Sequence, residues 1–368
     1  MNTDVVIVGA GPAGTAAAAH LGQLGVKDVI LVDKLDFPRD KTCGSGLSPK
    51  GIGTLRELGV WAAVEPHAYR VAGIRLVTPR GHESYQSAGD AVEAVICQRR
   101  VLDELILRRA QSLGVRFVPH FVADRLREER GRVTGVVAKD GRIVNARVTL
   151  VAGGTHCRLF PARARASPRL IKAIMGWWEG VPFRRGHVEM VFDPDLAPYY
   201  GWLFPESDQK VNIGITYQDP KNERNAREIF QRFLDKHYAT RLRSAKQIGA
   251  WKGHPIAYSY RIRRLTSKGC MLVGEAGLLT HPATGEGIYQ GMKSGVLAAQ
   301  ALRSLFAGED EAAAFARYEK SVRAAFQLSF LGGAAFRALV KTPILDWAVK
   351  VSEQPIIQSA AAKLIAAM

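Results

Sequence analysis

Three glycines near the amino terminus, Gly9, Gly11 and Gly14, have the Gly-x-Gly-x-x-Gly spacing of a dinucleotide-binding turn. In such a turn the first glycine permits a tight bend, the second lets the backbone approach a pyrophosphate, and the third lets a helix pack against a strand. Asp33 follows about 20 residues later, where a carboxylate accepts hydrogen bonds from a ribose hydroxyl. The spacing predicts a dinucleotide site, and by itself it does not separate NAD from FAD.

The surrounding sequence supplies the elements that this turn requires. Residues 4–8 are a continuous β-branched run, residues 15–21 are strong helix formers, and residues 29–32 form a second apolar run that ends at Asp33. This order of elements, a strand, the glycines, a helix, a second strand and an acid, predicts a β-α-β unit. The helix of such a unit begins at the phosphates of the bound dinucleotide.

Two further segments combine reactive and aromatic residues. Residues 36–50 read DFPRDKTCGSGLSPK and place Cys43 between a basic stretch and two glycines. Residues 198–205 read PYYGWLFP, so that Tyr200, Trp202 and Phe204 alternate along a predicted strand and project from one face of a sheet. Such a face is suited either to an apolar ligand cavity or to packing against a helix.

These motifs resemble the geranylgeranyl reductase family, within the larger group of flavoproteins built like para-hydroxybenzoate hydroxylase. The matching segments are residues 37–47 (Phe-Pro-Arg-x-Lys-x-Cys-Gly-x-Gly-Leu), 200–205 (Tyr-x-Trp-x-Phe-Pro), 273–277 and 282–288 (Pro-x-x-Gly-Glu-Gly-Ile). The resemblance implies an α/β fold in which a Rossmann-like FAD-binding domain is interleaved with an antiparallel-sheet substrate domain, followed by carboxy-terminal helices. It also implies FAD as cofactor, with NAD(P)H or another external reductant as a transient electron donor.

The resemblance assigns roles to individual residues. Cys43 and Tyr200 would be the catalytic polar groups, and the substrate would contact Gly44, Trp202, Phe204 and Pro205. The residues expected to bind FAD are Gly9, Gly11, Gly14, Asp33, Lys34, Cys43, Gly44, Arg99, Val122, Gly274, Glu275, Gly285, Gly287 and Ile288. Glu275 stands where the family usually has Asp. We expect no metal site.

The implied reaction is reduction of carbon–carbon double bonds in a prenylated or similarly apolar substrate by hydride transfer from reduced flavin. A flavin-dependent monooxygenase or halogenase that acts on an aromatic or prenylated product is the alternative. Residues 152–157 read AGGTHC where NADPH-dependent hydroxylases of this fold have Ala-Asp-Gly-x-x-Ser, which disfavours a conventional aromatic hydroxylase. A basic binding protein with a vestigial nucleotide fold is a third hypothesis, but no recognition motif for nucleic acid is present.

Composition limits the remaining possibilities. The 368 residues are 47% hydrophobic, enough for a large buried core, which excludes a mainly disordered chain. The four cysteines form no Cys-x-x-Cys pair, which disfavours a zinc site or a disulfide-stapled domain and favours the cytoplasm. The net charge of +17 would attract phosphate-bearing ligands or an anionic lipid surface.

We expect a discontinuous FAD-binding domain at residues 1–75, 95–165 and 265–310, and a substrate-binding sheet domain at 76–94 and 166–264. A helical segment at 311–368 should contain helices over residues 310–326, 336–351 and 355–368, after a long helix at 289–306. The last of these is alanine-rich with an apolar stripe, and it could pack on the protein or lie on a membrane surface that presents a lipid-like substrate. We therefore predict a cytoplasmic protein, possibly peripheral at the membrane, with no nucleic-acid partner.

Overall fold

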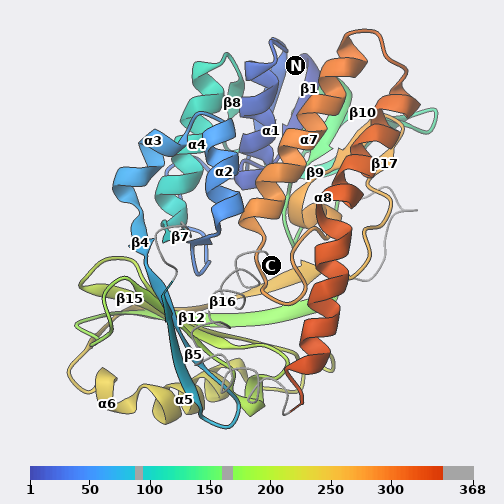
Figure 1. The fold of residues 1–368 in the computed structure, drawn as a ribbon. Coiled ribbons are helices and arrows are strands. Elements are labelled where there is room, and N and C mark those ends of the chain that lie inside the picture. Colours follow the sequence, from blue (N-terminus) through green and yellow to red (C-terminus); the bar gives the residue numbers. More distant parts are fainter. Residues whose placement is uncertain (88–93, 160–168, 343–368) are drawn as a thin grey trace.

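The predicted β-α-β unit forms part of a parallel sheet, which also contains strands from later in the chain (Figure 1). The computed structural model describes residues 1–87, 94–159 and 169–342. The sheet order is β17 (Thr266–Ser267), β18 (Cys270–Leu272), β11 (Ile143–Val151), β1 (Asn2–Val8), β2 (Val29–Val32) and β8 (Arg116–Val118), with β10 (Arg132–Ala138) and β9 (Ala123–Glu129) extending antiparallel from β11. The five strands from β18 to β8 run parallel, so their carboxyl ends meet at one edge.

Small residues let two helices cross closely over this sheet. Helix α1 (Pro12–Gln23) packs against α7 (Ile288–Phe306) and α4 (Arg99–Ser112). At Gly295 of α7, an added Cβ would be only 2.3 Å from the Ala13 carbonyl oxygen of α1. The alanine-rich run that favoured a helix in the sequence therefore also forms the contact surface between α1 and α7. Helices α2 (Pro49–Glu57), capped by the Ser48 hydroxyl, and α3 (Trp61–Val64) flank this layer.

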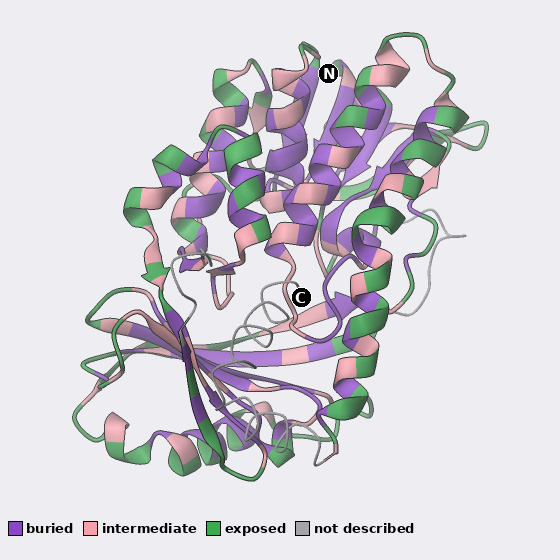
Figure 2. Ribbon diagram, in the orientation of Figure 1, coloured by how far each residue is buried: buried purple, intermediate pink, exposed green. Residues whose placement is uncertain are grey.

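The second sheet is almost entirely antiparallel. Its order is β16 (Lys246–Tyr258), β12 (Arg169–Glu179), β15 (Lys210–Tyr217), β14 (Gly201–Pro205), β13 (His187–Val191), β5 (Gly73–Val77) and β6 (Glu83–Ser87), with only β13 and β5 paired in parallel. Helices α5 (Ala226–His237) and α6 (Ala239–Leu242) cover its outer face, where Leu203, Ile213 and Phe230 are buried. The opposite face carries Tyr200 and Trp202. A small sheet of β3 (Gly46–Leu47), β7 (Ala94–Ile96) and β4 (Tyr69–Val71) lies between the two larger sheets. Figure 2 shows that the strands of the parallel sheet are largely buried.

The carboxy-terminal part of the described chain is one helix, α8 (Glu311–Leu339), which runs alongside both sheets (Figure 1). The prediction of separate helices over 310–326 and 336–351 was wrong. The helix continues through Gly332 and Gly333, and a bare Gly333 lets it pack closely on His281, since a Cβ there would be 2.9 Å from Cε1 of His281. Residues 343–351 of the second predicted helix lie outside the described residues. The predicted helix at 355–368 lies outside the described residues.

The predicted domain boundaries can be placed on these elements. The boundary at residue 75 falls inside β5, which begins at Gly73 and belongs to the antiparallel sheet. Strand β12 and its neighbours through β16 lie within the predicted substrate domain, and β17, β18 and α7 lie in the last FAD-binding segment. Chain segments therefore pass back and forth between the two sheets.

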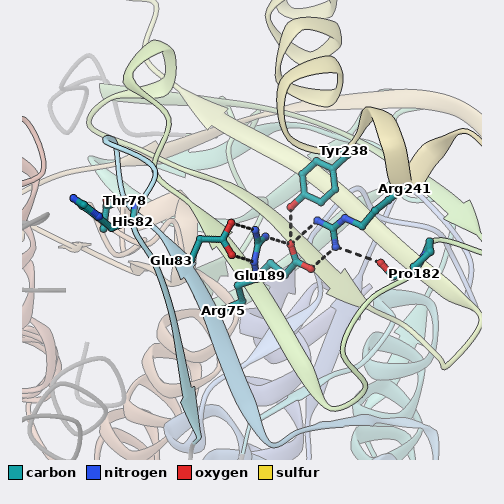
Figure 3. A network of polar contacts seen from close by, with 8 residues as sticks. All are labelled: Arg75, Thr78, His82, Glu83, Pro182, Glu189, Tyr238 and Arg241. Atoms are coloured by element: carbon teal, nitrogen blue, oxygen red, sulfur yellow. Dashed lines mark hydrogen bonds and ion pairs between the residues drawn. The ribbon is translucent and has the colours of Figure 1, made fainter. Parts of the chain in front are cut away.

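A buried ionic network holds α6 and the sheet edge together (Figure 3). Glu189 of β13 is only 3% exposed and accepts hydrogen bonds from Arg241 of α6 at 2.6 and 2.9 Å and from Arg75 of β5 at 2.8 Å. Arg75 also pairs with Glu83 of β6, and the Tyr238 hydroxyl donates to Glu189 at 3.3 Å. Burial alone would raise the pKa of Glu189, but Arg241 and Arg75 outweigh it and hold that pKa below its ordinary value.

Replacing Glu189 with Gln should therefore destabilise the fold by about 2–3 kcal/mol at neutral pH, because two arginines lose their shared carboxylate. The lowered pKa means that the ionic contribution is complete above the ordinary value of 4.5 and is lost as the pH falls through the folded-state pKa. The difference in the free energy of unfolding between wild type and Glu189→Gln should shrink on acidification, which denaturant titrations at a series of pH values can measure. A difference that stays constant or grows towards acid pH would contradict this account.

Candidate active site

A cavity of about 700 Å³ lies where the carboxyl edge of the parallel sheet meets the inner face of the antiparallel sheet. This volume is in the range typical of small-molecule and cofactor sites. Its walls come from the β1–α1 turn, residues 33–50, residues 152–156, the strands β12, β14 and β16, and the loop that precedes α7. The cavity therefore collects segments from almost the whole length of the chain.

The β1–α1 turn forms one end of the cavity. Gly9 has φ +107°, and a Cβ there would be 2.6 Å from the Ala152 carbonyl oxygen. Asp33 Oδ2 accepts a hydrogen bond from the Ala10 amide at 2.7 Å, and Oδ1 accepts one from the Leu35 amide at 2.9 Å. The carboxylate thus fixes the turn, and its remaining lone pairs are available to a ribose hydroxyl.

The start of α1 is built to receive an anion. Gly11, its N-cap residue, supplies no side-chain cap, and Gly11, Pro12 and Ala13 line the cavity. The first amides of a helix have no partner within the helix and carry the positive end of its dipole. The only atom near a Cβ built at Gly11 is Nη2 of Arg39, at 3.8 Å, so a guanidinium lies beside the open helix end. These features fit the pyrophosphate of a dinucleotide.

A second glycine-rich wall faces this turn. Gly274 follows β18 with φ +59°, and its amide donates to the Ser294 hydroxyl of α7 at 2.8 Å. Gly285 has φ +69°, and Gly287 is the N-cap of α7. All three line the cavity, as do Gly153 and Gly154 after β11. Side-chain-free backbone at a helix start gives a planar ring room to approach the amides, which fits a flavin as well as the first wall fits its phosphates.

Glu275 connects this wall to the antiparallel sheet. Its Oε1 accepts a hydrogen bond from the Ala257 amide of β16 at 2.8 Å, and its side chain lines the cavity. The longer Glu side chain, in place of the usual Asp, thus reaches strand β16 while it remains at the cofactor site.

Charged groups cluster along the middle of the cavity. Arg99 is buried and forms a two-pronged ion pair with Asp103, at 2.7 Å for each bond, and Arg39 approaches the same carboxylate at 3.3 Å. Arg99 also hydrogen-bonds the Cys43 thiol, whose sulfur accepts the Ser45 amide at 3.3 Å. Although burial disfavours its charge, the charge of Asp103 raises the pKa of Arg99, so that it remains a cation next to Cys43.

Lys41 and two histidines complete this cluster. Lys41 Nζ lies 2.8 Å from Nε2 of His254 on β16, and the ring of His156 contacts that of His254 edge-on at 5.2 Å between centroids. Burial, reinforced by Arg99, lowers the pKa of Lys41 to about 8. Burial, reinforced by Lys41, lowers the pKa of His254 to about 4, so that His254 is neutral and can accept a hydrogen bond from the lysine.

The far end of the cavity is apolar. Tyr200, which precedes β14, and Trp202 and Phe204 of β14 line it, together with Met175 of β12 and Ile256 of β16. Gly44 lies directly over the aromatic residues, since a Cβ there would be 3.3 Å from the Phe204 ring and 3.5 Å from Trp202 Nε1. The Cys43 loop and the aromatic strand therefore form a single surface.

A buried histidine fixes the loop that closes this end. His281 is fully buried, and its Nδ1 accepts the Thr284 amide at 3.2 Å, while its Nε2 lies 3.3 Å from the Ser329 carbonyl of α8. The Tyr200 hydroxyl donates to the Thr284 carbonyl at 2.5 Å. Helix α8, through Ser329, and Tyr200, just before β14, thus both hold residues 281–286.

Comparisons with known proteins identify the family. Residues 2–159 match the family model of an FAD binding domain, and residues 179–254 match that of a geranylgeranyl reductase catalytic domain. The chain is 32% identical over 327 residues to menaquinone reductase of Mycobacterium tuberculosis, an alignment that covers 82% of this chain and 77% of that protein. The chain belongs to the geranylgeranyl reductase family of FAD-dependent oxidoreductases. Another member, digeranylgeranylglycerophospholipid reductase 1 of Methanothermobacter thermautotrophicus, is 28% identical over 87% of this chain and 82% of its own length.

Solved structures agree on the fold of this family. A geranylgeranyl bacteriochlorophyll reductase-like protein from Thermoplasma acidophilum superimposes with a TM-score of 0.87 at 23% identity, covering 99% of this chain and 95% of that one. The flavin-dependent brominase Bmp2 superimposes with a TM-score of 0.84 at 20% identity, covering 100% of this chain and 94% of its own. Likenesses at this level of identity show the shared fold alone.

The structure brings together most of the site residues that we predicted from the sequence. Gly9, Gly11, Asp33, Lys34, Cys43, Gly44, Arg99, Tyr200, Trp202, Phe204, Gly274, Glu275, Gly285, Gly287 and Ile288 all line the cavity. Three do not. Gly14 packs against the Gly9 carbonyl, where a Cβ would be 1.9 Å from the oxygen; Pro205 is buried at the end of β14; and Val122 is 40% exposed after β8. Their proposed contacts, like the roles of the lining residues, stay predictions.

Several residues of the site were not singled out from the sequence. Lys41 and Glu286 belong to the quoted family motifs, and that position was the available signal for them. His254 and Met175 lie on strands whose pairing brings them to the cavity, and no local pattern marks them. Among the described residues, no group of three or more His, Cys, Asp or Glu side chains is arranged to hold a metal ion.

Two glycine substitutions separate cofactor binding from folding. Gly11→Ala should leave stability nearly unchanged, because a Cβ there meets only the end of Arg39, but it should weaken FAD binding by about 10- to 100-fold because the methyl group projects into the phosphate site. Gly9→Ala should instead destabilise the protein by about 2 kcal/mol or more, since φ is positive and the Ala152 carbonyl is too close. FAD titration of the flavin-free protein and denaturant unfolding measure the two effects. Equal FAD affinity in wild type and Gly11→Ala would exclude the phosphate site at α1.

Proposed function

We propose that this oxidoreductase reduces carbon–carbon double bonds in a prenylated or similarly apolar, lipid-like substrate. The observation that supports this best is the continuity of the cavity: the aromatic surface of β14 adjoins the glycine-rich wall suited to the flavin ring. An apolar chain placed on Trp202 and Phe204 would present its double bond to that wall. The names of two relatives, which refer to a quinone and to a digeranylgeranyl lipid, agree with such a substrate.

FAD supplies the hydride chemistry when it is bound and reduced. The chain's own residues would bind and orient the substrate. Tyr200, Trp202 and Phe204 offer a flat apolar surface, and Gly44 brings Cys43 to its edge. Burying the alkene against this surface excludes water from the reacting atoms and fixes their distance, which are the protein's main contributions to such a reaction.

The two predicted catalytic residues differ in what they can do. The Tyr200 O–H is engaged by the Thr284 carbonyl, and burial, followed by the charges of Glu286 and Cys43, raises its pKa. We therefore propose that Tyr200 positions the 281–286 loop. Cys43 stays at the boundary between the flavin wall and the aromatic surface, in contact with Arg99, where it can shape the contact between substrate and ring.

We further propose that NAD(P)H, or another external reductant, donates electrons transiently. The described chain contains one dinucleotide-binding turn, at Gly9, Gly11 and Gly14, which the FAD-binding domain uses. A second dinucleotide would then have to bind at the cavity mouth rather than on a fold of its own.

Anaerobic reduction followed by rapid mixing tests the reaction. Dithionite-reduced holoenzyme mixed anaerobically with a geranylgeranylated substrate should be reoxidised, with a saturated prenyl chain as the product seen by mass spectrometry. Mixing with O₂ should reoxidise the flavin without a long-lived absorption band at roughly 370–400 nm, where a flavin–oxygen adduct absorbs. Such an adduct, together with no reaction with the alkene, would instead establish the monooxygenase or halogenase alternative.

A contact with an anionic membrane surface would bring such a substrate to the enzyme. Between residues 324 and 339 of α8, every exposed residue is apolar: Ala324, Ala325, Leu328, Leu331, Gly332, Ala335, Ala338 and Leu339. Leu328 is 82% exposed. The neighbouring loop, which bonds α8 through Gln327, exposes Arg261 and Arg263, and the chain carries a net charge of +17. An apolar strip beside cations favours an interface with anionic lipid.

No helix among the described residues is long and apolar enough to span a bilayer. The proposed contact is therefore one in which α8 lies along the lipid surface. The predicted membrane contact of residues 355–368 lies outside the described residues.

Leu328→Glu should weaken binding to phosphatidylglycerol vesicles by about tenfold. The substitution removes a leucine that would be buried in the lipid interface, and it adds a negative charge there. Binding should also fall with added salt and be weaker on phosphatidylcholine vesicles. Co-sedimentation measures both effects, and Ile143→Glu, a 40% exposed residue of β11, is the matched control. Unchanged sedimentation of Leu328→Glu would exclude α8 as the contact.

A further inference from the structure

A carboxyl group beside the aromatic surface of the cavity, that of Glu286, has no role in the reaction proposed above. Glu286 lies between Gly285 and Gly287 in the loop before α7, and its side chain lines the cavity together with Tyr200 and Cys43. Reduction of a double bond by a hydride needs a proton for the second carbon. A source of that proton must therefore lie at this end of the cavity.

The contacts of Glu286 hold a carboxyl group in place. Gln290, one turn into α7, approaches Glu286 Oε2 through its side-chain amide at 3.2 Å, and Ser48, the N-cap of α2, also hydrogen-bonds the carboxyl. Gln290 is 2% exposed, and its Oε1 has no partner in the described structure. Rotation of the Gln290 amide by 180° would turn this unpartnered oxygen towards Glu286, where it can accept a carboxyl proton. The site therefore accommodates both the carboxylic acid and the carboxylate.

The charged and titratable groups around Glu286 are few. Lys50 of α2 is exposed, and its charge favours the carboxylate, while Tyr200, just before β14, and Tyr289 of α7 are neutral phenols near it. Burial outweighs Ser48, Gln290 and Lys50, and raises the pKa of Glu286 above its ordinary value. A carboxyl group with a raised pKa keeps its proton closer to neutral pH, as a general acid requires.

Apart from the Cys43 thiol, whose sulfur accepts the Ser45 amide, the other proton donors at this end are already engaged. The Tyr200 hydroxyl donates to the Thr284 carbonyl, and His281 is fully buried with contacts at both ring nitrogens. Lys41 points to His254, in the middle of the cavity. Glu286 is thus the carboxyl group that faces the aromatic surface with a transferable proton.

We propose that Glu286 is the general acid of the reaction, an assignment that rests on the proposed alkene reduction. One alkene carbon accepts the hydride from reduced flavin, which becomes oxidised. The π-electron pair of the double bond would take the carboxyl proton of Glu286 at the other carbon, so that two C–H bonds form as the π bond, the carboxyl O–H bond and the N–H bond of the reduced flavin break. The resulting carboxylate is stabilised by Ser48, Gln290 and the amino-terminal end of α7, and it regains a proton from water on the exposed Lys50 side.

Glu286→Gln, which keeps the shape and can still hydrogen-bond, is the decisive variant. Anaerobic reoxidation of its reduced holoenzyme by the geranylgeranylated substrate should be about 100- to 10,000-fold slower than in wild type, while reoxidation by O₂, FAD content and unfolding temperature should not change. In wild type the alkene-dependent rate should fall as the pH rises through the pKa of Glu286, because the carboxylate cannot donate. This limb should be absent from Glu286→Gln, and Glu286→Asp should partly restore both the rate and the limb. Glu309→Gln, remote from the cavity, is the matched control.

Infrared difference spectra of wild type minus Glu286→Gln give a readout that is independent of turnover. They should contain a protonated carboxyl band that disappears at the pH where the rate falls. Alkene-dependent reoxidation of Glu286→Gln at the wild-type rate, an unchanged pH limb in that variant, or no such carboxyl band would overturn the role of Glu286. If reduced wild type reacts with O₂ but with no prenylated alkene, the proposed function itself fails, and the assignment of Glu286 fails with it.

Discussion

The close crossing of α1 and α7 is the constraint on which the rest of the site depends. Gly295 and Gly291 of α7 leave room for the backbone of Ala13 and Ala17 in α1, and a Cβ at Gly295 would overlap the Ala13 carbonyl. Because the two helices are in contact near their amino ends, both open into the same cavity, α1 at Gly11 and α7 at Gly287. Two positive helix ends thus open into one cavity, where one would meet the phosphates of FAD and the other its ring. A larger residue at Gly295 would therefore push the two helix starts apart.

Buried charges then fix the loops that the helices leave open. Asp33 bonds two backbone amides, Glu275 bonds one from the opposite sheet, and Asp103 is shared by two arginines. None of these carboxylates is left without a partner, so their burial is compensated. In contrast, the raised pKa of Glu286 shows a carboxyl group whose partners do not fully offset its burial. That difference separates groups that hold the cavity together from one able to exchange a proton in it.

Elements that rest on interactions between nearby residues could be predicted from the sequence, whereas contacts between distant segments could not. The strands at 2–8 and 29–32, the glycine turn and helix α7 rest on local periodicity and small-residue spacing, and the structure has them within two residues of the predicted bounds. The continuity of α8 was missed because Gly332 and Gly333 suggest a break locally, whereas the contact with His281 that requires Gly333 is made 52 positions away in the chain. The pairing of Lys41 with His254 joins residues 213 positions apart, through the register of β12 and β16. Such contacts follow from topology, and no pattern in either segment indicates them.

The similarity in fold to a flavin-dependent brominase bears on which part of the structure selects the reaction. A brominase superimposes on this chain over its full length, so the helix crossing and the two-sheet frame do not by themselves select a reaction. Selection has to come from what the antiparallel sheet presents to the cofactor wall. Here that surface consists of Tyr200 and the β14 residues Trp202 and Phe204 beneath the Cys43 loop, with Met175 and Ile256 beside them and the carboxyl group of Glu286 at its edge. An apolar surface of this kind would favour close contact between an alkene and the flavin ring, and it would disfavour water at the reacting atoms. Under the proposed function, selection of the reaction would depend on Tyr200, on β14 and on the two loops that cover it, while the remainder of the chain keeps those elements in register.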